Sequence, residues 1–317
     1  MPPQVQTVLG PVAPEALGVV DMHEHVRFGM PGWETEAGDL FARDAMLAET
    51  VRRFAAFGAA GGRTIVDVTG IGLGRDVAFY QDVARDAGVQ LVACTGFWAQ
   101  RGILPRYQHW YDIDAFEELF VRELTVGIGD SGVRAGVIKV GNSREGITPV
   151  EERTYRAAAR AARRTGAAVV THGMPWGEEQ FRILREEGLD AERIVISHLD
   201  DPTALDFERD KRLAAQGAFI AYDHIGYEPE SSPMHYAMPD ARRVELVQAI
   251  LAAGYERHLV LACDSKGWSL DLPFQPTPSH GCAWLLEQFW PRLLAAGVPE
   301  SAFQTIMVET PRRILPF

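Results

Sequence analysis

The sequence predicts an α/β fold, a single-domain (β/α)8 barrel, and three observations lead to that prediction. Short apolar segments alternate with amphipathic stretches, glycines follow several of these stretches, and reactive side chains follow several apolar segments. Repeated βα units imply a parallel sheet. The 317 residues suit one barrel of about 250 residues with short extensions, which we place at residues 1–17 and 297–317.

Eight segments read as strands, and most of them are rich in Val, Ile or Ala without alternation, as strands buried on both faces should be. They are residues 18–22, 64–68, 89–94, 136–140, 167–171, 193–197, 218–222 and 258–262. Apolar residues recur at helical spacing in residues 42–57, 115–126, 152–164 and 241–253. Eight βα units favour closure into a barrel, and a doubly wound open sheet is the alternative.

Residues 70–74 form a glycine-rich segment that follows a predicted strand. Its spacing is G-x-G-x-G, whereas a dinucleotide site needs G-x-G-x-x-G and an acidic residue further on. We therefore interpret it as a flexible βα loop.

Charge and composition exclude several classes of partner. The net charge is −12 and no run of Lys or Arg occurs, which argues against nucleic acid and anionic membrane surfaces. No apolar run is long enough to cross a bilayer, and residues 1–14 lack the pattern of a signal peptide. The three cysteines are far apart, which indicates buried thiols in a reducing compartment, and we expect the cytoplasm.

His23 and His25 are the first candidate metal ligands. They lie two residues apart after the first predicted strand, so their side chains point to the same face. Paired imidazoles suit a divalent ion such as zinc. Glu24 should point into the barrel wall and is not expected to be a ligand.

Further candidate ligands follow other strands. His172 and His198 end two successive strands, which favours a second metal, and Asp264 follows the eighth strand. In a βα barrel the C-terminal strand ends carry the reactive residues. Asp264 is therefore expected to bind a metal and to accept a proton from a bound water.

Lys139 lies in the apolar run of residues 136–140. Burial disfavours the ammonium form and makes the neutral amine available. A neutral amine can add carbon dioxide to give a carbamate whose oxygens bridge two cations. The alternatives are a pair with a buried acid or an error of strand register, but beside the histidines we favour the bridge.

Together these residues resemble the phosphotriesterase family of the amidohydrolase superfamily, over essentially the whole chain. The matching motifs occur in family order: residues 6–12, Met22-His23-Glu24-His25, Gly74-Arg75-Asp76, residues 134–140, Thr171-His172, His198-Leu199-Asp200-Asp201, Asp223-His224-Ile225 and Thr310-Pro311-Arg312-Arg313. The resemblance implies a (β/α)8 barrel with a binuclear centre, usually of zinc and sometimes of cobalt, manganese or iron. It also implies a homodimer.

The resemblance also implies a role for each ligand. His23, His25 and Asp264 should hold one metal, and His172 and His198 the other. Carboxylated Lys139 and a hydroxide should bridge them. Attack by the hydroxide would pass a proton to Asp264, and then through His224 toward Asp201 and solvent.

The substrate is expected to be a small lactone, carboxylic ester or phosphotriester. The lactonase branch of the family tends to carry Tyr and Arg where this chain has Trp98 and His224, and both choices resemble the phosphotriesterase branch. Residues 265–278, read as a loop, match neither branch. Trp98, Tyr227 and Trp268 are candidate pocket walls, and packing beneath the loops is an equal alternative for them.

Two other functions remain as alternatives. One is an amide hydrolase of N-acylated small molecules, and the other is a non-catalytic ligand-binding barrel. The intact set of ligands, base and relay residues argues against the non-catalytic barrel.

Overall fold

A computed structural model describes residues 2–33, 42–271 and 279–317. Ten parallel strands within this part of the chain form the walls of the barrel. They are β3 (Val19–Phe28), β4 (Gly62–Asp67), β5 (Gln90–Val92), β6 (Cys94–Phe97), β7 (Val137–Val140), β8 (Ala168–Val170), β9 (Ile194–Ile196), β10 (Phe219–Tyr222), β11 (Leu259–Leu261) and β12 (Ser265–Ser269).

The strands pair in sequence order and close on themselves. A six-stranded sheet runs from β6 to β11, and a four-stranded sheet has the order β12-β3-β4-β5. Ala93 alone separates β5 from β6, and residues 262–264 separate β11 from β12. The backbone N–H of Asp264 donates to the carbonyl of His23 at 2.9 Å across the second break. The two sheets therefore make one barrel, which confirms the predicted fold class.

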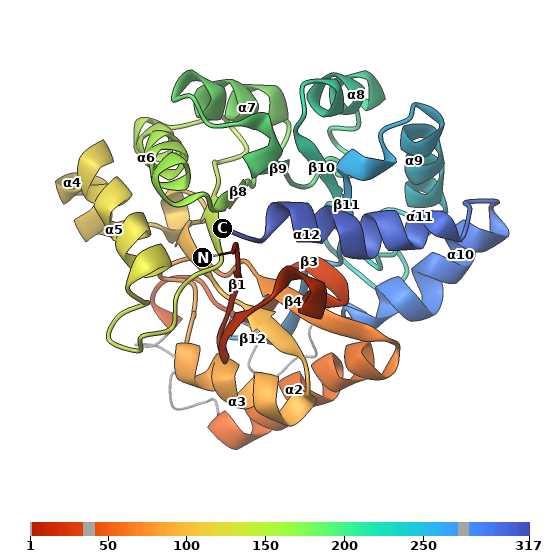
Figure 1. Cartoon of the computed structure of the whole chain (residues 1–317), viewed down its shortest axis with the longest axis horizontal. Coiled ribbons are helices and arrows are strands. Elements are labelled where there is room, and N and C mark those ends of the chain that lie inside the picture. Colours follow the sequence, from red (N-terminus) through yellow and green to blue (C-terminus); the bar gives the residue numbers. More distant parts are fainter. Residues whose placement is uncertain (1, 34–41, 272–278) are drawn as a thin grey trace.

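Helices surround the barrel (Figure 1) and follow the strands along the chain. Those between β3 and β11, with α10 after β12, are α2 (Arg43–Ala59), α3 (Val77–Ala87), α4 (Pro105–Trp110), α5 (Ile113–Thr125), α6 (Pro149–Thr165), α7 (Gly177–Glu186), α8 (Phe207–Ala215), α9 (Asp240–Ala252) and α10 (Trp290–Ala295). The local sequence explains why several of these helices begin where they do. Asp76, Asp112 and Asp206 cap α3, α5 and α8, and Thr148 forms a capping box with Glu151 at α6, because side-chain oxygens satisfy free N–H groups there.

Both ends of the chain meet at one end of the barrel. The barrel interior is apolar, and Val5, Leu17, Ile314 and Leu315 belong to the same core. Two short strands, β1 (Val5–Thr7) and β2 (Gly10–Val12), form an antiparallel hairpin, and α11 (Ser301–Gln304) and α12 (Thr310–Ile314) end the chain. Figure 1 shows both termini near the barrel axis. This leaves the opposite end, with the C-terminal strand ends, open for a site.

Two features differ from the prediction. Of the predicted loop 265–278, residues 265–269 instead form β12, which pairs with β3 from Ser265↔Glu24 to Ser269↔Phe28, and residues 272–278 lie outside the described residues. The sequence of β12, Ser-Lys-Gly-Trp-Ser, lacks the Val, Ile and Ala of the other strands and therefore has the composition of a loop. Strand β3 also continues to Phe28, so His23 and His25 lie inside a strand rather than beyond its end.

Among the helices in the described part of the chain, none is both long and apolar enough to cross a membrane.

Candidate metal centre

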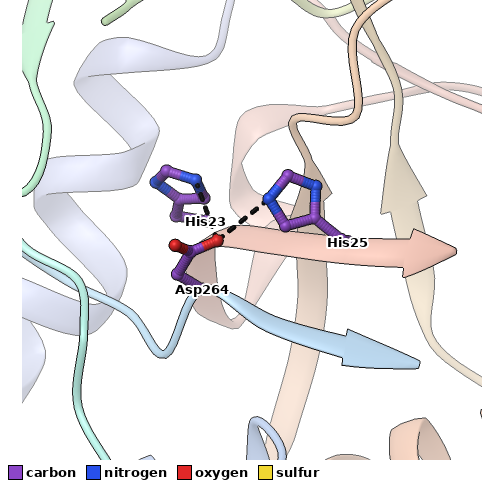
Figure 2. A group of neighbouring side chains, drawn as sticks. All are labelled: His23, His25 and Asp264. Carbon is purple, nitrogen blue, oxygen red and sulfur yellow. Dashed lines mark ion pairs between the residues drawn. The ribbon is translucent and has the colours of Figure 1, made fainter. Parts of the chain in front are cut away.

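His23 and His25 project from β3 toward Asp264, which lies just after β11 (Figure 2). Asp264 Oδ1 is 2.9 Å from His25 Nε2 and 3.5 Å from His23 Nε2. The alternation of side chains along β3 places both imidazoles on one face, while Glu24 points away and contacts the hydroxyl of Ser265. One nitrogen or oxygen from each of the three residues could bind a single cation.

Asp264 has an unusual backbone conformation, with φ 47°. Non-glycine residues rarely adopt this left-handed region, and where they do the surrounding structure must hold them. Here the N–H of Asp264 donates to the carbonyl of His23, and the hydroxyl of Tyr227 donates to the carbonyl of Asp264 at 2.8 Å. Its carboxylate is thereby held between the two histidines.

Lys139 reaches the same place from β7. Its Nζ is 3.4 Å from His23 Nε2 and donates to the carbonyl of Thr171 at 2.9 Å. Burial lowers the pKa of Lys139 to about 8, which makes the neutral amine accessible near neutral pH. Gly96 on β6 allows this packing, since a Cβ there would lie 2.0 Å from the Lys139 carbonyl oxygen.

His172 and His198 follow β8 and β9 and contact each other. His172 Nδ1 is 2.7 Å from His198 Nε2, and the rings of His23 and His198 are 5.0 Å apart. Burial lowers the pKa of His23 to about 3 and holds the pKa of His172 well below its ordinary value. Neutral imidazoles are the form that binds metals.

The six residues predicted as metal ligands therefore converge in the half of the barrel that holds the C-terminal strand ends. They are His23, His25, Lys139, His172, His198 and Asp264. Imidazole nitrogens and a carboxylate suit zinc and similar divalent ions. A carboxylated lysine would supply the anionic bridge that the free amine lacks. The donor set thus fits a metal centre, although the identity of the metal stays a prediction.

Asp223, at the end of β10, links the two halves of this set and was missed by the sequence analysis. Its Oδ2 is 2.7 Å from His23 Nδ1, and its Oδ1 is 2.8 Å from His198 Nδ1 and accepts from the His198 N–H at 2.8 Å. Burial opposes ionisation, but the two imidazoles outweigh it and hold the pKa of Asp223 well below its usual range. A carboxylate on Nδ1 leaves Nε2 free for a metal.

His25 is oriented by a separate chain of contacts. Its Nδ1 is 2.8 Å from Thr69 Oγ1, and that hydroxyl contacts Asp67 Oδ2 at 3.1 Å. Asp67 ends β4 and also accepts from the hydroxyl of Tyr80 at 3.1 Å. Sequence reasoning missed this chain too, although Asp67 and Thr69 flank the end of a predicted strand.

His224 lies beside Asp264, as the predicted proton relay requires. Its Nε2 is 3.5 Å from Asp264 Oδ2, and its ring stacks on that of His198 at 4.4 Å. Burial lowers the pKa of His224, but Asp264 and the carboxylate of Asp200 outweigh this effect and raise the pKa above its ordinary value. His224 is therefore a suitable acceptor for a proton from Asp264.

The next step of the predicted relay has a different neighbour. Asp200 Oδ1 is 3.6 Å from His224 Nδ1, and Asp200 also accepts from Arg243 Nε at 2.8 Å. Asp201 accepts from the backbone N–H of Thr203 at 2.8 Å instead, and it lines the cavity together with His224. The carboxylate that faces His224 Nδ1 therefore belongs to Asp200 and not to Asp201. Proton transfer from His224 to Asp201 stays a prediction.

A cavity of about 630 Å³ opens above these side chains. Trp98 lines it, as predicted, and its ring is 5.1 Å from that of His172. Tyr227 and Trp268 are not among the described residues that line it. Tyr227 is buried beneath Asp264, and Trp268 is partly buried against the apolar core that includes the helices around the barrel. The aromatic lining also includes Phe28 and Tyr236, which the sequence analysis did not identify.

Comparison with known proteins shows the family to which the chain is similar. The model of the phosphotriesterase family matches residues 3–315. A phosphotriesterase homology protein of Mycobacterium tuberculosis is 33% identical, and the match covers 98% of this chain and 97% of that protein. An aryldialkylphosphatase of Saccharolobus solfataricus is 31% identical, with 94% of each chain covered. An N-acetyltaurine hydrolase of Tetraodon nigroviridis is 28% identical over 99% of this chain and 98% of that protein.

The fold has solved counterparts as well. A variant of a phosphotriesterase-like lactonase from Deinococcus radiodurans is 33% identical and superposes with a TM-score of 0.89, covering 98% of this chain and 99% of that one. The match to the family model extends over nearly the whole chain and over every candidate ligand described above. The chain therefore belongs to the phosphotriesterase family.

Proposed function

We propose that this protein is a binuclear metal-dependent hydrolase that cleaves the ester bond of a small lactone, carboxylic ester or phosphotriester. One observation carries the proposal: six potential ligands converge beneath a cavity of about 630 Å³ at the C-terminal strand ends. Membership of the phosphotriesterase family supports a metal-dependent hydrolase. The similarity to an aryldialkylphosphatase and to a lactonase supports ester substrates.

In this proposal His23, His25 and Asp264 would hold one ion, His172 and His198 would hold the other, and N6-carboxylated Lys139 would supply an anionic ligand to both. Two divalent ions, with zinc as our first choice, would supply an ionised water near neutral pH and polarise the substrate oxygen. Asp223 would keep Nε2 of His23 and of His198 available as ligands, because it occupies the Nδ1 atom of both rings.

The side chains around the centre would handle the proton. Asp264 is ionised, since its imidazole neighbours outweigh burial and hold its pKa well below the usual range. It can take the proton of the attacking water, and His224 is placed at 3.5 Å to receive it. Asp201, on the cavity side, would return it to solvent. Trp98 and Phe28 would pack against the apolar part of the substrate.

Amide hydrolysis of an N-acylated small molecule is a second candidate. It is supported by the N-acetyltaurine hydrolase that matches 99% of this chain. The same residues would serve both reactions, because a carbonyl carbon is attacked in each. Esters and amides must therefore be compared directly.

A substrate panel with metal analysis tests the proposal. Zinc- and manganese-loaded protein is assayed against lactones, aryl esters, aryl phosphotriesters and N-acyl amino acids, with chelator-treated protein as the control. We expect about two metals per chain and turnover that a chelator removes. Fewer than about one metal together with no metal-dependent turnover would overturn the hydrolase assignment.

The proposal extends to assembly and location. We propose a homodimer, to be measured by light scattering. We also propose a cytoplasmic enzyme, in which the buried thiols of Cys94, Cys263 and Cys282 stay reduced. Fractionation of the native cells checks the location.

A further inference from the structure

Two aromatic rings form a continuous wall that runs from one half of the candidate metal centre to the other. The ring of Phe28 is 5.2 Å from that of His25, and the ring of Trp98 is 5.1 Å from that of His172. Phe28 and Trp98 contact each other edge to face with centroids 6.0 Å apart. Both line the cavity, so a substrate whose reacting group lies at the metals can extend along this pair.

A cation lies over each ring of this wall. The Arg101 guanidinium is 4.4 Å from the centroid of Trp98, and Lys266 Nζ is 5.1 Å from the centroid of Phe28. Both side chains line the cavity. The aromatic faces hold the two cations in place, but a ring does not neutralise their charge.

Neither cation has an acidic partner in the part of the chain that the structure describes. Within the described ranges 2–33, 42–271 and 279–317, no carboxylate forms an ion pair with Arg101 or Lys266. Arg144, another basic side chain of the cavity, differs because it donates to Thr203 Oγ1 at 2.5 Å and is 3.9 Å from Asp201. Glu145 and Asp271 also line the cavity, yet they leave the two stacked cations unpaired.

We propose that Arg101 and Lys266 recognise an anionic group, a carboxylate or sulfonate, on a short tail of the substrate. Each cation offers N–H donors to an oxyanion, and such charge-assisted bonds are about twice as strong as neutral ones. The tail would lie along the Phe28–Trp98 wall while the ester or acyl group reaches the metals. The position of the reacting group rests on the proposed function, whereas the anion site rests on the two cations alone.

Direct binding to the zinc-loaded protein tests the anion site without requiring turnover. The probes are N-acetyl-β-alanine, its sulfonate counterpart N-acetyltaurine, and the neutral amide of N-acetyl-β-alanine, all titrated by calorimetry. We expect each anion to bind at least about tenfold more tightly than the amide, and the preference to fall as salt is added. A larger preference for one of the two anions shows whether the site favours a carboxylate or a sulfonate. Equal binding of all three probes, or no binding of any, overturns the proposal.

Variants separate the two cations from the metals, which can also bind carboxylates. Arg101→Met and Lys266→Met should each reduce anion affinity about tenfold and leave amide affinity unchanged. The double variant should lose the preference. Arg106→Met and Lys211→Met are matched controls, because Arg106 and Lys211 also lie over aromatic rings, those of Tyr107 and Phe207, but do not line the cavity. A double variant that still prefers the anions, or a control that loses as much, overturns the proposal.

Phenyl acetate, a neutral ester, distinguishes this inference from the proposed function. If all variants hydrolyse phenyl acetate as the parent does while none alters anion binding, the hydrolase stands and the anion site fails. If the parent hydrolyses no ester or amide but its anion preference depends on Arg101 and Lys266, the anion site stands and the proposed function fails.

Discussion

Asp223→Asn is expected to weaken metal binding by both halves of the candidate centre at once. The carboxylate serves three groups: the ring nitrogens Nδ1 of His23 and His198, and the backbone N–H of His198. Asparagine keeps one oxygen and replaces the other by an NH2 donor. Whichever histidine faces that NH2 must place its proton on Nε2, so the nitrogen that should bind a metal becomes a donor.

The size of the effect follows from the role of this carboxylate. Loss of a partner that orients a metal-bound histidine costs about 10- to 100-fold in affinity, or roughly 1.4–2.7 kcal/mol. Asp223 orients one histidine in each half, and the amide oxygen can satisfy only one of them. We therefore expect a loss of at least about tenfold at one site, with weaker occupancy of the other through the shared Lys139.

Competition with a fluorescent chelator, together with metal analysis of the dialysed protein, measures this loss. Asp210→Asn is the matched control. Asp210 is also buried and accepts from Arg209 and, at 3.1 Å, from the hydroxyl of Tyr222, but it lies on α8 beneath the barrel wall. The control should lower the unfolding temperature without changing zinc affinity. If Asp223→Asn binds two zinc ions as tightly as the parent, the assigned role of Asp223 is wrong.

Four further predictions concern the ligands and the relay. Lys139→Met should lose most of the metal and its activity, because a thioether cannot form a carbamate, and activity retained without added carboxylate would count against carboxylation. Asp264→Asn should keep part of its metal and lose most turnover; full activity in a steady-state assay would contradict its role as base. His224→Ala should slow substrates whose chemistry limits turnover and spare those limited by product release, which pre-steady-state bursts distinguish. Because the pKa of Lys139 is lowered to about 8, the fraction of neutral amine rises with pH toward and beyond that value. Reconstitution of stripped protein at fixed dissolved carbon dioxide should therefore accelerate from pH 6.5 to 8.5, and a rate independent of pH would exclude the neutral amine.

The barrel was predictable because its signal is local and repeated. Strands buried on both faces are apolar throughout, and all eight predicted segments overlap an observed strand or strand pair. The strand that the prediction missed is β12, since residues 265–269 have a loop-like composition and form a strand only beside β3. Pairing of this kind depends on barrel closure, and periodicity within one segment carries no information about it.

The ligands of the candidate centre were predictable from the sequence, whereas the aspartates that orient them were not. A histidine at the end of an apolar strand stands out in the sequence, and the barrel brings all such ends together. Asp223 and Asp67 also stand at strand ends, but an aspartate there is common as a cap or turn residue. Their roles depend on which histidine each one meets across the barrel: Asp223 meets His23 across 200 positions of sequence.

Backbone strain offers an independent argument for the site. In the described part of the chain, the non-glycine residues with positive φ are His198 at 62° and Asp264 at 47°, both predicted ligands. Each is held by one hydrogen bond from its own N–H, to Asp223 Oδ1 and to the carbonyl of His23. Such strain persists where the surroundings enforce it, and it concentrates at functional sites. Asp223 therefore holds a strained backbone as well as two imidazoles, so its replacement should lower the stability of the metal-free protein in addition to its affinity for metal.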